Sequence, residues 1–111
     1  MKILNQFPNE LSKRDAYRLT KAQSVKKMSE AAGSVLNPSA WVLFEDLNSK
    51  TGELQNVLVL EDNGEMFATV SKTFIKEFCD ACEAFDNNPG AIKVIEGTTK
   101  SGRKFITCEL A

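Results

Sequence analysis

Three cysteines are the residues of this chain best suited to redox or metal chemistry, and two of them form a C-x-x-C pair. Cys79 and Cys82 could be a redox pair or half of a zinc site, with Cys108 as a third thiol. A structural zinc ion needs four ligands, and the chain has no histidine to complete them. A redox pair is typical of a helix N-terminus, whereas this pair falls in the middle of an expected helix. Packing of reduced thiols in the core is favoured instead, so we expect no metal, no cofactor and no functional disulfide.

Catalytic groups are also sparse. The absence of histidine removes the commonest general base and any Ser-His or Cys-His nucleophile pair. The acidic pairs at 45–46 and 61–62 fall near expected strand ends and turns, where solvated carboxylates are common. The stretch 97–102 is followed by arginine and lacks the Gly-Lys-Ser/Thr and helix of a phosphate-binding loop. We therefore expect that the protein is not an enzyme.

Aromatic residues on otherwise polar strand faces give a stronger signal. Phe67 in the run 65–71 and Phe105 in the run 104–110 each alternate with residues of a second, mostly apolar set. If that set faces the core, the two rings face outwards and can stack on nucleic-acid bases, worth about 1–3 kcal/mol per base. Trp41 is a third candidate ring. The alternative is that the N-terminal helix or a partner chain covers these rings. The basic residues expected to contact phosphates are Lys26, Lys27, Lys72, Lys100, Arg103 and Lys104.

Charge is unevenly distributed along the 111 residues, although the net charge is only −1. Residues 1–28 contain seven basic and two acidic side chains, whereas residues 29–65 contain one basic and seven acidic. Residues 93–111 are again basic. If the fold brings the two ends together, a positive face can form on an acidic protein. The alternative is that these are ordinary solvated charges.

Hydrophobic periodicity predicts the elements that position these residues. Three strands are expected over 41–47, 55–61 and 65–71, followed by a helix over 72–85 with one apolar stripe. A hairpin is expected over 91–110, turning near 101–102. Ser12 can cap a short basic helix over 13–22. In chain order the sequence thus predicts a basic helix, three strands, a helix and two strands.

That order is typical of a mainly β protein with α, a five-stranded OB-fold barrel preceded by a short basic N-terminal helix. Such barrels bind single-stranded nucleic acid or oligosaccharide on one face. We expect residues 1–23 to form the N-terminal basic helical extension and residues 24–111 the barrel. The first strand of such a barrel is long and bent, and we expect some of 25–36 to precede or begin it.

Two stretches resemble a known family. Residues 63–73 (NGEMFATVSKT) and 92–105 (IKVIEGTTKSGRKF) are similar to the single-stranded DNA-binding protein of small protein-primed tailed phages of Gram-positive bacteria. The resemblance covers about two-fifths of the chain. It implies an OB-fold protein that coats replication intermediates, with Phe67 and Phe105 at the positions of family aromatics. The basic helix before the barrel departs from the family pattern, which leaves the oligomeric state and the path of the DNA open.

The expected function is sequence-nonspecific binding of single-stranded DNA, in support of DNA replication of a phage or mobile genetic element. No apolar run resembles a signal peptide or a membrane span, so we expect a cytoplasmic protein with no membrane partner. A second copy of the chain and replication proteins are further candidate partners. The alternative function is that of a protein-binding OB domain of a mobile element that modulates a host factor, which the acidic middle of the chain suits.

Overall fold

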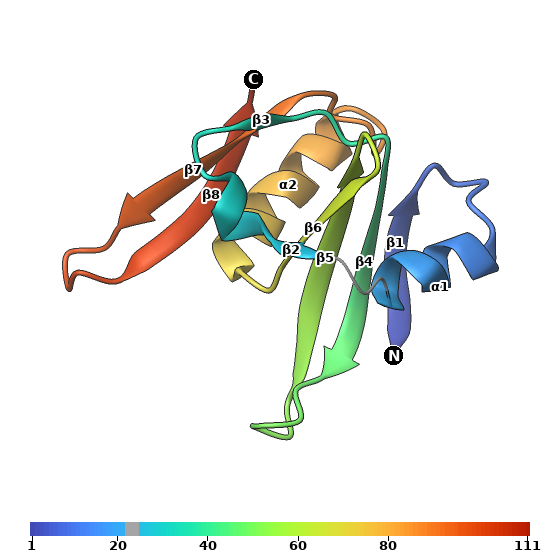
Figure 1. The fold of residues 1–111 in the computed structure, drawn as a ribbon, viewed down its shortest axis with the longest axis horizontal. Helices are drawn as coiled ribbons and strands as arrows, with labels where there is room; N and C mark the ends of the chain where they lie inside the picture. The colour runs from blue at the N-terminus through green and yellow to red at the C-terminus, as the bar shows by residue number, and fades with distance from the viewer. Residues whose placement is uncertain (22–24) are drawn as a thin grey trace.

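The computed structural model describes residues 1–21 and 25–111 (Figure 1). Within these ranges the protein is mainly β, with two α-helices and one short 3-10 helix. The expected end of the first helix at residue 22 and the expected domain boundary between 23 and 24 lie outside the described residues. In chain order the elements are β1 (Lys2–Phe7), α1 (Lys13–Lys21), β2 (Lys26–Lys27), η1 (Met28–Ala31), β3 (Val35–Leu36), β4 (Ala40–Leu47), β5 (Leu54–Asp62), β6 (Glu65–Thr69), α2 (Lys72–Ala84), β7 (Ile92–Thr98) and β8 (Lys104–Leu110).

The strands form two sheets. Sheet A has the order β1-β4-β5-β6-β2, and sheet B has the order β3-β7-β8. The β4-β5-β6 part is an antiparallel meander, and Asn63 and Gly64 between β5 and β6 have the positive φ angles, 52° and 85°, that a tight hairpin turn requires. Among the described strands, no pairing joins the two sheets into a closed barrel.

One extended segment links the two sheets. β3 pairs with β7 in sheet B, and β4, which follows after residues 37–39, pairs with β5 in sheet A. The expected long, bent strand therefore corresponds to β3 and β4 together, although β3 contributes only two residues. The expected strand over 65–71 is shorter than predicted, because Ser71 accepts a hydrogen bond from the Phe74 N–H at 3.2 Å and caps α2.

The main core lies between the inner faces of the two sheets and α2. Phe74, Phe78 and Cys82 form the buried stripe of α2. The Trp41 ring of β4 meets the Phe78 ring edge-on, with 5.3 Å between the ring centroids. β7 and β8 close this core from the other side, where Val94 and Ile106 are buried.

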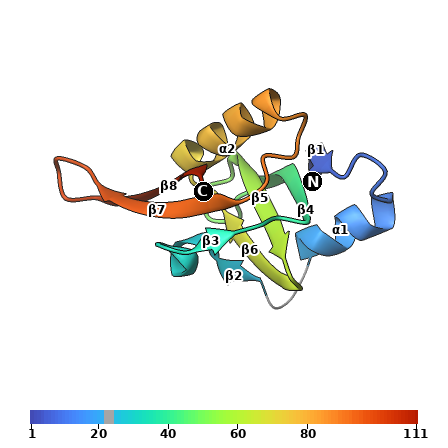
Figure 2. The same cartoon turned by 90° about the horizontal axis from the view of Figure 1, so that it is seen from above.

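A second core covers the outer face of sheet A. Ala16 and Leu19 of α1 are buried there against Val42, Phe44 and other residues of β4 and β5. Figure 2 shows α1 and α2 on opposite sides of this sheet. β1, which the sequence did not predict, pairs with the edge of β4. Its alternation is interrupted by a bulge between residues 3 and 5, which weakens the strand pattern. The N-terminal segment is thus packed on the sheet and is more than an appended helix.

The described part of the chain is compact. Its Cα radius of gyration is 13.5 Å, close to the value of about 13 Å expected for a folded domain of this length. No helix in residues 1–21 or 25–111 is long and apolar enough to cross a membrane.

Candidate nucleic-acid interface

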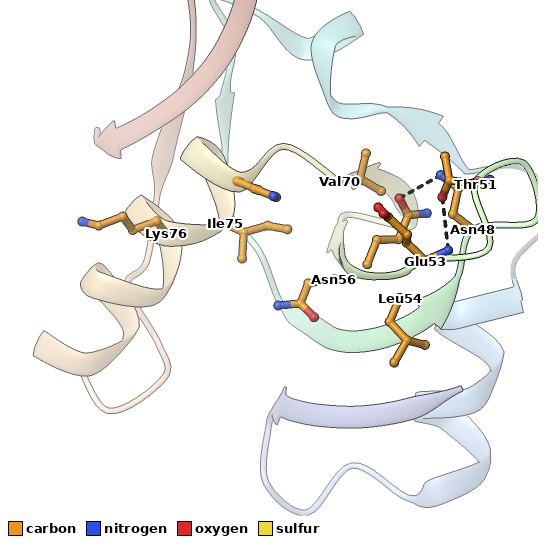
Figure 3. Close-up of a pocket in the computed structure, with 10 residues that line it drawn as sticks. Asn48, Thr51, Glu53, Leu54, Asn56, Val70, Ile75 and Lys76 are labelled. Atoms are coloured by element: carbon orange, nitrogen blue, oxygen red, sulfur yellow. Dashed lines mark hydrogen bonds between the residues drawn. The ribbon is translucent and has the colours of Figure 1, made fainter.

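Two adjacent grooves lie between the β4–β5 turn and the β7–β8 hairpin. The first has a volume of about 550 Å³ and is bounded by that turn, the start of β5 and the start of α2 (Figure 3). The second has a volume of about 740 Å³ and is bounded by η1, the end of β6 and β8. Val70 borders both. Because they share this residue, we refer to the two grooves together as the two-groove surface.

The β4–β5 turn forms one wall of the first groove. The Asn48 side-chain oxygen accepts hydrogen bonds from the backbone N–H groups of Lys50 at 2.9 Å and Thr51 at 3.4 Å, and these fix the turn. Exposed apolar side chains of Leu54 and Val70 line the same groove beside polar residues of β5. The groove thus offers both apolar contact and hydrogen-bonding groups to a ligand.

The second groove is held in shape by hydrogen bonds around Ser71. Its hydroxyl donates to the Ile106 carbonyl oxygen at 3.2 Å, and its N–H donates to the Thr69 hydroxyl oxygen at 3.0 Å. The first bond ties the segment after β6 to β8, and the second fixes the conformation of that segment. Six of the twelve residues lining the groove are apolar, and charged side chains lie among the others at Lys27, Glu96 and Lys104.

The β7–β8 hairpin projects from the body of the molecule (Figures 1 and 2). Its tip is closed by hydrogen bonds from the Thr99 N–H to the Arg103 carbonyl at 2.8 Å and from the Gly102 N–H to the Thr99 carbonyl at 2.9 Å. Lys100 and Arg103, two of the residues predicted to contact phosphates, are exposed at this tip.

Phe105 faces outwards on β8, as the alternation predicts. Its neighbour Ile106 is buried, whereas Phe105 is 36% exposed. The ring lies across Gly97 of β7, where a Cβ atom would come within 2.4 Å of the ring. The glycine therefore allows the ring to lie flat against the strand, leaving part of the aromatic surface open beside the second groove, which Phe105 also borders.

The outward orientation predicted for Phe67 is wrong. Phe67 is only 7% exposed and belongs to the main core. The alternation predicted that Met66 and Ala68 face the core and Phe67 faces outwards. Met66 and Ala68 instead pack on the opposite face of β6, in the cluster beneath α1. Because both faces of β6 carry packed apolar side chains, alternation along this strand does not reveal which set of residues belongs to the main core.

The role predicted for Trp41 is also wrong. Trp41 is 1% exposed, and its indole N–H donates to the Asn87 carbonyl oxygen at 3.0 Å. The ring is thus a core residue with a satisfied polar group. Neither Trp41 nor Phe67 can stack on a base without disruption of the core.

The predicted basic residues fall into three groups, of which Lys100 and Arg103 at the hairpin tip line neither groove. Lys27, Lys72 and Lys104 line the two-groove surface. Lys26 does not: it donates to a Glu65 carboxylate oxygen at 3.0 Å, and its Nζ lies 5.9 Å from the centre of the Phe67 ring. Sheet pairing directs Lys26 to this position, since β2 runs parallel to β6.

Lys76 is a groove residue that was not predicted from the sequence. It lies one helical turn after Lys72, and this i, i+4 spacing could have suggested that both share a face. Its ammonium group donates to an Asp80 carboxylate oxygen at 3.1 Å, and this hydrogen bond raises the pKa of Lys76. The charged residues lining the two grooves are Lys27, Glu53, Lys72, Lys76, Glu96 and Lys104.

The cysteines lie away from this surface. Cys82 and Cys108 are buried in the main core, and burial raises the pKa of each thiol to about 12. Burial likewise raises the pKa of the partly buried Cys79. Core packing thus describes the pair better than a reactive site. Among the described residues, no group of three or more potential ligand side chains is placed to hold a metal ion.

No protein-family model, no curated protein and no solved structure matches this chain. A functional assignment must therefore come from the two-groove surface and the hairpin themselves.

Proposed function

We propose that the protein binds single-stranded DNA without sequence preference along the two-groove surface, in support of the replication of a phage or mobile genetic element in the host cytoplasm. The observation that carries the proposal is the excess of cations there. Four lysines, one of them paired with Asp80, and two glutamates line the grooves of a protein whose net charge is −1. Local positive charge beside apolar surface is the combination with which single-strand binders hold phosphates and bases.

The arrangement of elements supports the same proposal. The order β4, β5, β6, α2, β7, β8 is that of an OB fold, and the β3–β4 segment pairs with both sheets as the first OB strand does. OB folds bind their ligands on the second and third strands, between the loops that follow the first and fourth strands. In this chain the equivalent strands are β5 and β6, and the equivalent loops are the β4–β5 turn and the β7–β8 tip.

The shape of the surface favours single strands over duplex. Apolar side chains such as Leu54 and Val70 line the grooves, and Phe105 adds a partly open ring. These groups contact bases only when the bases are unstacked and unpaired, because a duplex keeps them inside the helix. The lysines meet the backbone of any sequence equally, so we expect weak sequence preference.

The test measures binding of the full chain to labelled oligo-dT and to duplex DNA of equal length over a series of salt concentrations. Lys72→Gln/Lys104→Gln should weaken oligo-dT binding and make the log–log salt slope shallower by about 0.7 for each phosphate that is no longer neutralised. A matched control, Lys2→Gln/Lys93→Gln, removes the same charge from residues outside both grooves. Equal affinity for duplex, or binding that does not change with salt, would count against the proposal.

A protein partner is the second candidate, and the apolar character of the second groove favours it. An apolar peptide in this groove would tolerate Lys72→Gln/Lys104→Gln but would be excluded by Val70→Lys, since Val70 is 52% exposed and borders both grooves. Single-stranded DNA should show the opposite pattern, because an added lysine provides a further phosphate contact.

A further inference from the structure

The exposed face of α1 is a second basic feature, separate from the two-groove surface. Ala16 and Leu19 form the buried face of this helix. Four residues on its opposite side recur at i, i+3, i+4 and i+7, the spacing that places side chains on one helical face. This α1 basic face consists of Arg14, Tyr17, Arg18 and Lys21.

The cations of this face are largely free to bind an anion. Asp15 is the one acidic residue of α1, and its contact with Arg18, at 3.5 Å, joins two exposed side chains. Such surface pairs contribute little and exchange readily. In the described part of the chain, no ion pair involves Arg14 or Lys21. The α1 basic face is therefore not neutralised by the protein itself.

Tyr17 adds an aromatic group to the same face. Tyr17 is 52% exposed, which is unusual for a largely apolar side chain. The Lys21 ammonium lies 6.0 Å from the centre of its ring. An exposed ring with cations beside it is the arrangement that accepts a base and its phosphate in single-strand binders. Packing does not account for Tyr17, because the residues that cover the sheet are Ala16 and Leu19.

The chain itself holds α1 close to the two-groove surface. Lys21 ends α1, and Lys26 begins β2 five residues later, so the two Cα atoms are at most about 18 Å apart. Lys27, the next residue, lines the second groove. Figures 1 and 2 both show β2 between α1 and the β7–β8 hairpin. One strand of DNA can thus pass from the hairpin over β2 to α1.

We propose that the α1 basic face is a second contact for the phosphodiester backbone of the same strand that occupies the two-groove surface. This inference rests on the proposed function and extends it, because it assigns a role to residues outside both grooves. A short strand fills the grooves alone, whereas a longer strand also reaches Arg14 and Lys21. Contacts to phosphate carry no sequence information, so the extension lengthens the site without making it more selective.

The experiment compares oligo-dT of about 5 and about 15 nucleotides, near the two ends of the range of site sizes known for OB folds. Arg14→Gln/Lys21→Gln in the full chain removes two exposed charges and leaves the Arg18–Asp15 contact and the buried face in place. For the longer strand, its log–log salt slope should be shallower by about 1.4, which corresponds to two phosphate contacts. For the shorter strand, affinity and slope should match the unsubstituted protein. Lys2→Gln/Lys93→Gln again serves as the charge-matched control.

The outcomes that contradict this inference are distinguishable. If the short strand binds and the double variant leaves the long-strand slope unchanged, or changes it no more than the control does, the α1 inference is overturned while the proposed function stands. Equal losses of affinity for the short and the long strand would also overturn the α1 inference, since they would indicate a general effect of charge. Loss of binding to vesicles that contain phosphatidylserine, with an unchanged slope for DNA, would assign the face to a membrane instead. If neither strand binds the unsubstituted protein, both proposals fail together.

Discussion

The meander of sheet A and the hairpin of sheet B use similar strand sequences in different surroundings. β6 has packed residues on both faces, with Phe67 in the main core and Met66 and Ala68 against the cluster beneath α1. The outer part of the β7–β8 hairpin has a core face and a solvent face, with Ile106 buried and its neighbour Phe105 partly open. An aromatic residue in alternation with other apolar residues is thus a core residue in one sheet and a candidate ligand contact in the other. What decides between them is the cover supplied by residues distant in sequence.

Truncation of Phe67 and Phe105, one at a time, tests most directly whether their environments differ. Phe67→Ala should reduce the free energy of unfolding by about 3–5 kcal/mol, because it leaves a cavity in the main core. Phe105→Ala is the matched control and should cost much less, since its ring is partly exposed and lies over a glycine. Urea denaturation of both variants measures the difference. Equal losses would show that the two environments are not distinct.

A second prediction addresses the cover on the outer face of sheet A. Leu19→Ala should reduce the free energy of unfolding by about 2–4 kcal/mol, because it opens a gap between α1 and β4 or β5. Tyr17→Ala on the exposed side of the same helix is the control, and thermal or urea denaturation should show a change in stability of less than about 0.5 kcal/mol. If Leu19→Ala were as mild as Tyr17→Ala, α1 would be an appendage, as its sequence alone suggested.

These differences define what the sequence could and could not predict. The strand and helix positions of the last two-thirds of the chain follow from local patterns, including the Asn-Gly turn and the stripe of α2. The orientation of Phe105 was predictable because one face of its hairpin is open. The orientation of Phe67 was not, since nothing local shows that the N-terminal segment packs on the far side of the sheet. The meeting of Lys27 and Lys104 at one groove is likewise a tertiary property.

A third prediction tests whether the partly open ring of Phe105 contacts a DNA base. Phe105→Ala should weaken binding to oligo-dT by about 1–3 kcal/mol if one base stacks on the ring, and it should leave the salt slope unchanged because the ring neutralises no phosphate. Fluorescence anisotropy at several salt concentrations separates the two quantities. Phe105→Tyr, which keeps an aromatic ring, should retain most of the affinity. A Phe105→Ala variant that binds normally would remove this ring from the interface.

The fourth prediction, with the smallest expected effect, concerns the buried thiol of Cys108 on the core face of β8 and that of Cys82 on α2. Cys108 and Cys82 have pKa values raised by burial to about 12, so both thiols stay protonated in the folded protein at neutral pH. Iodoacetamide should therefore modify them only after denaturation. Since the folded state keeps these protons to higher pH than the unfolded state, the contribution of the two thiols to stability should be constant below about pH 9 and fall between about pH 9 and pH 12. Rapid alkylation of Cys108 at neutral pH in the native protein would contradict this burial.

The two neighbours of β4 differ greatly in how far along the chain they lie, and this sets an order of assembly. Six residues separate β4 from β5, whereas 32 residues separate β1 from β4. Closing the longer loop costs about 1.5 kcal/mol more in chain entropy. We therefore expect the β4–β5 hairpin to form early in folding and β1 to join last. In the intervening state the edge of β4 and the outer face of sheet A are uncovered, and aggregation at this edge is the expected failure of a refolding reaction.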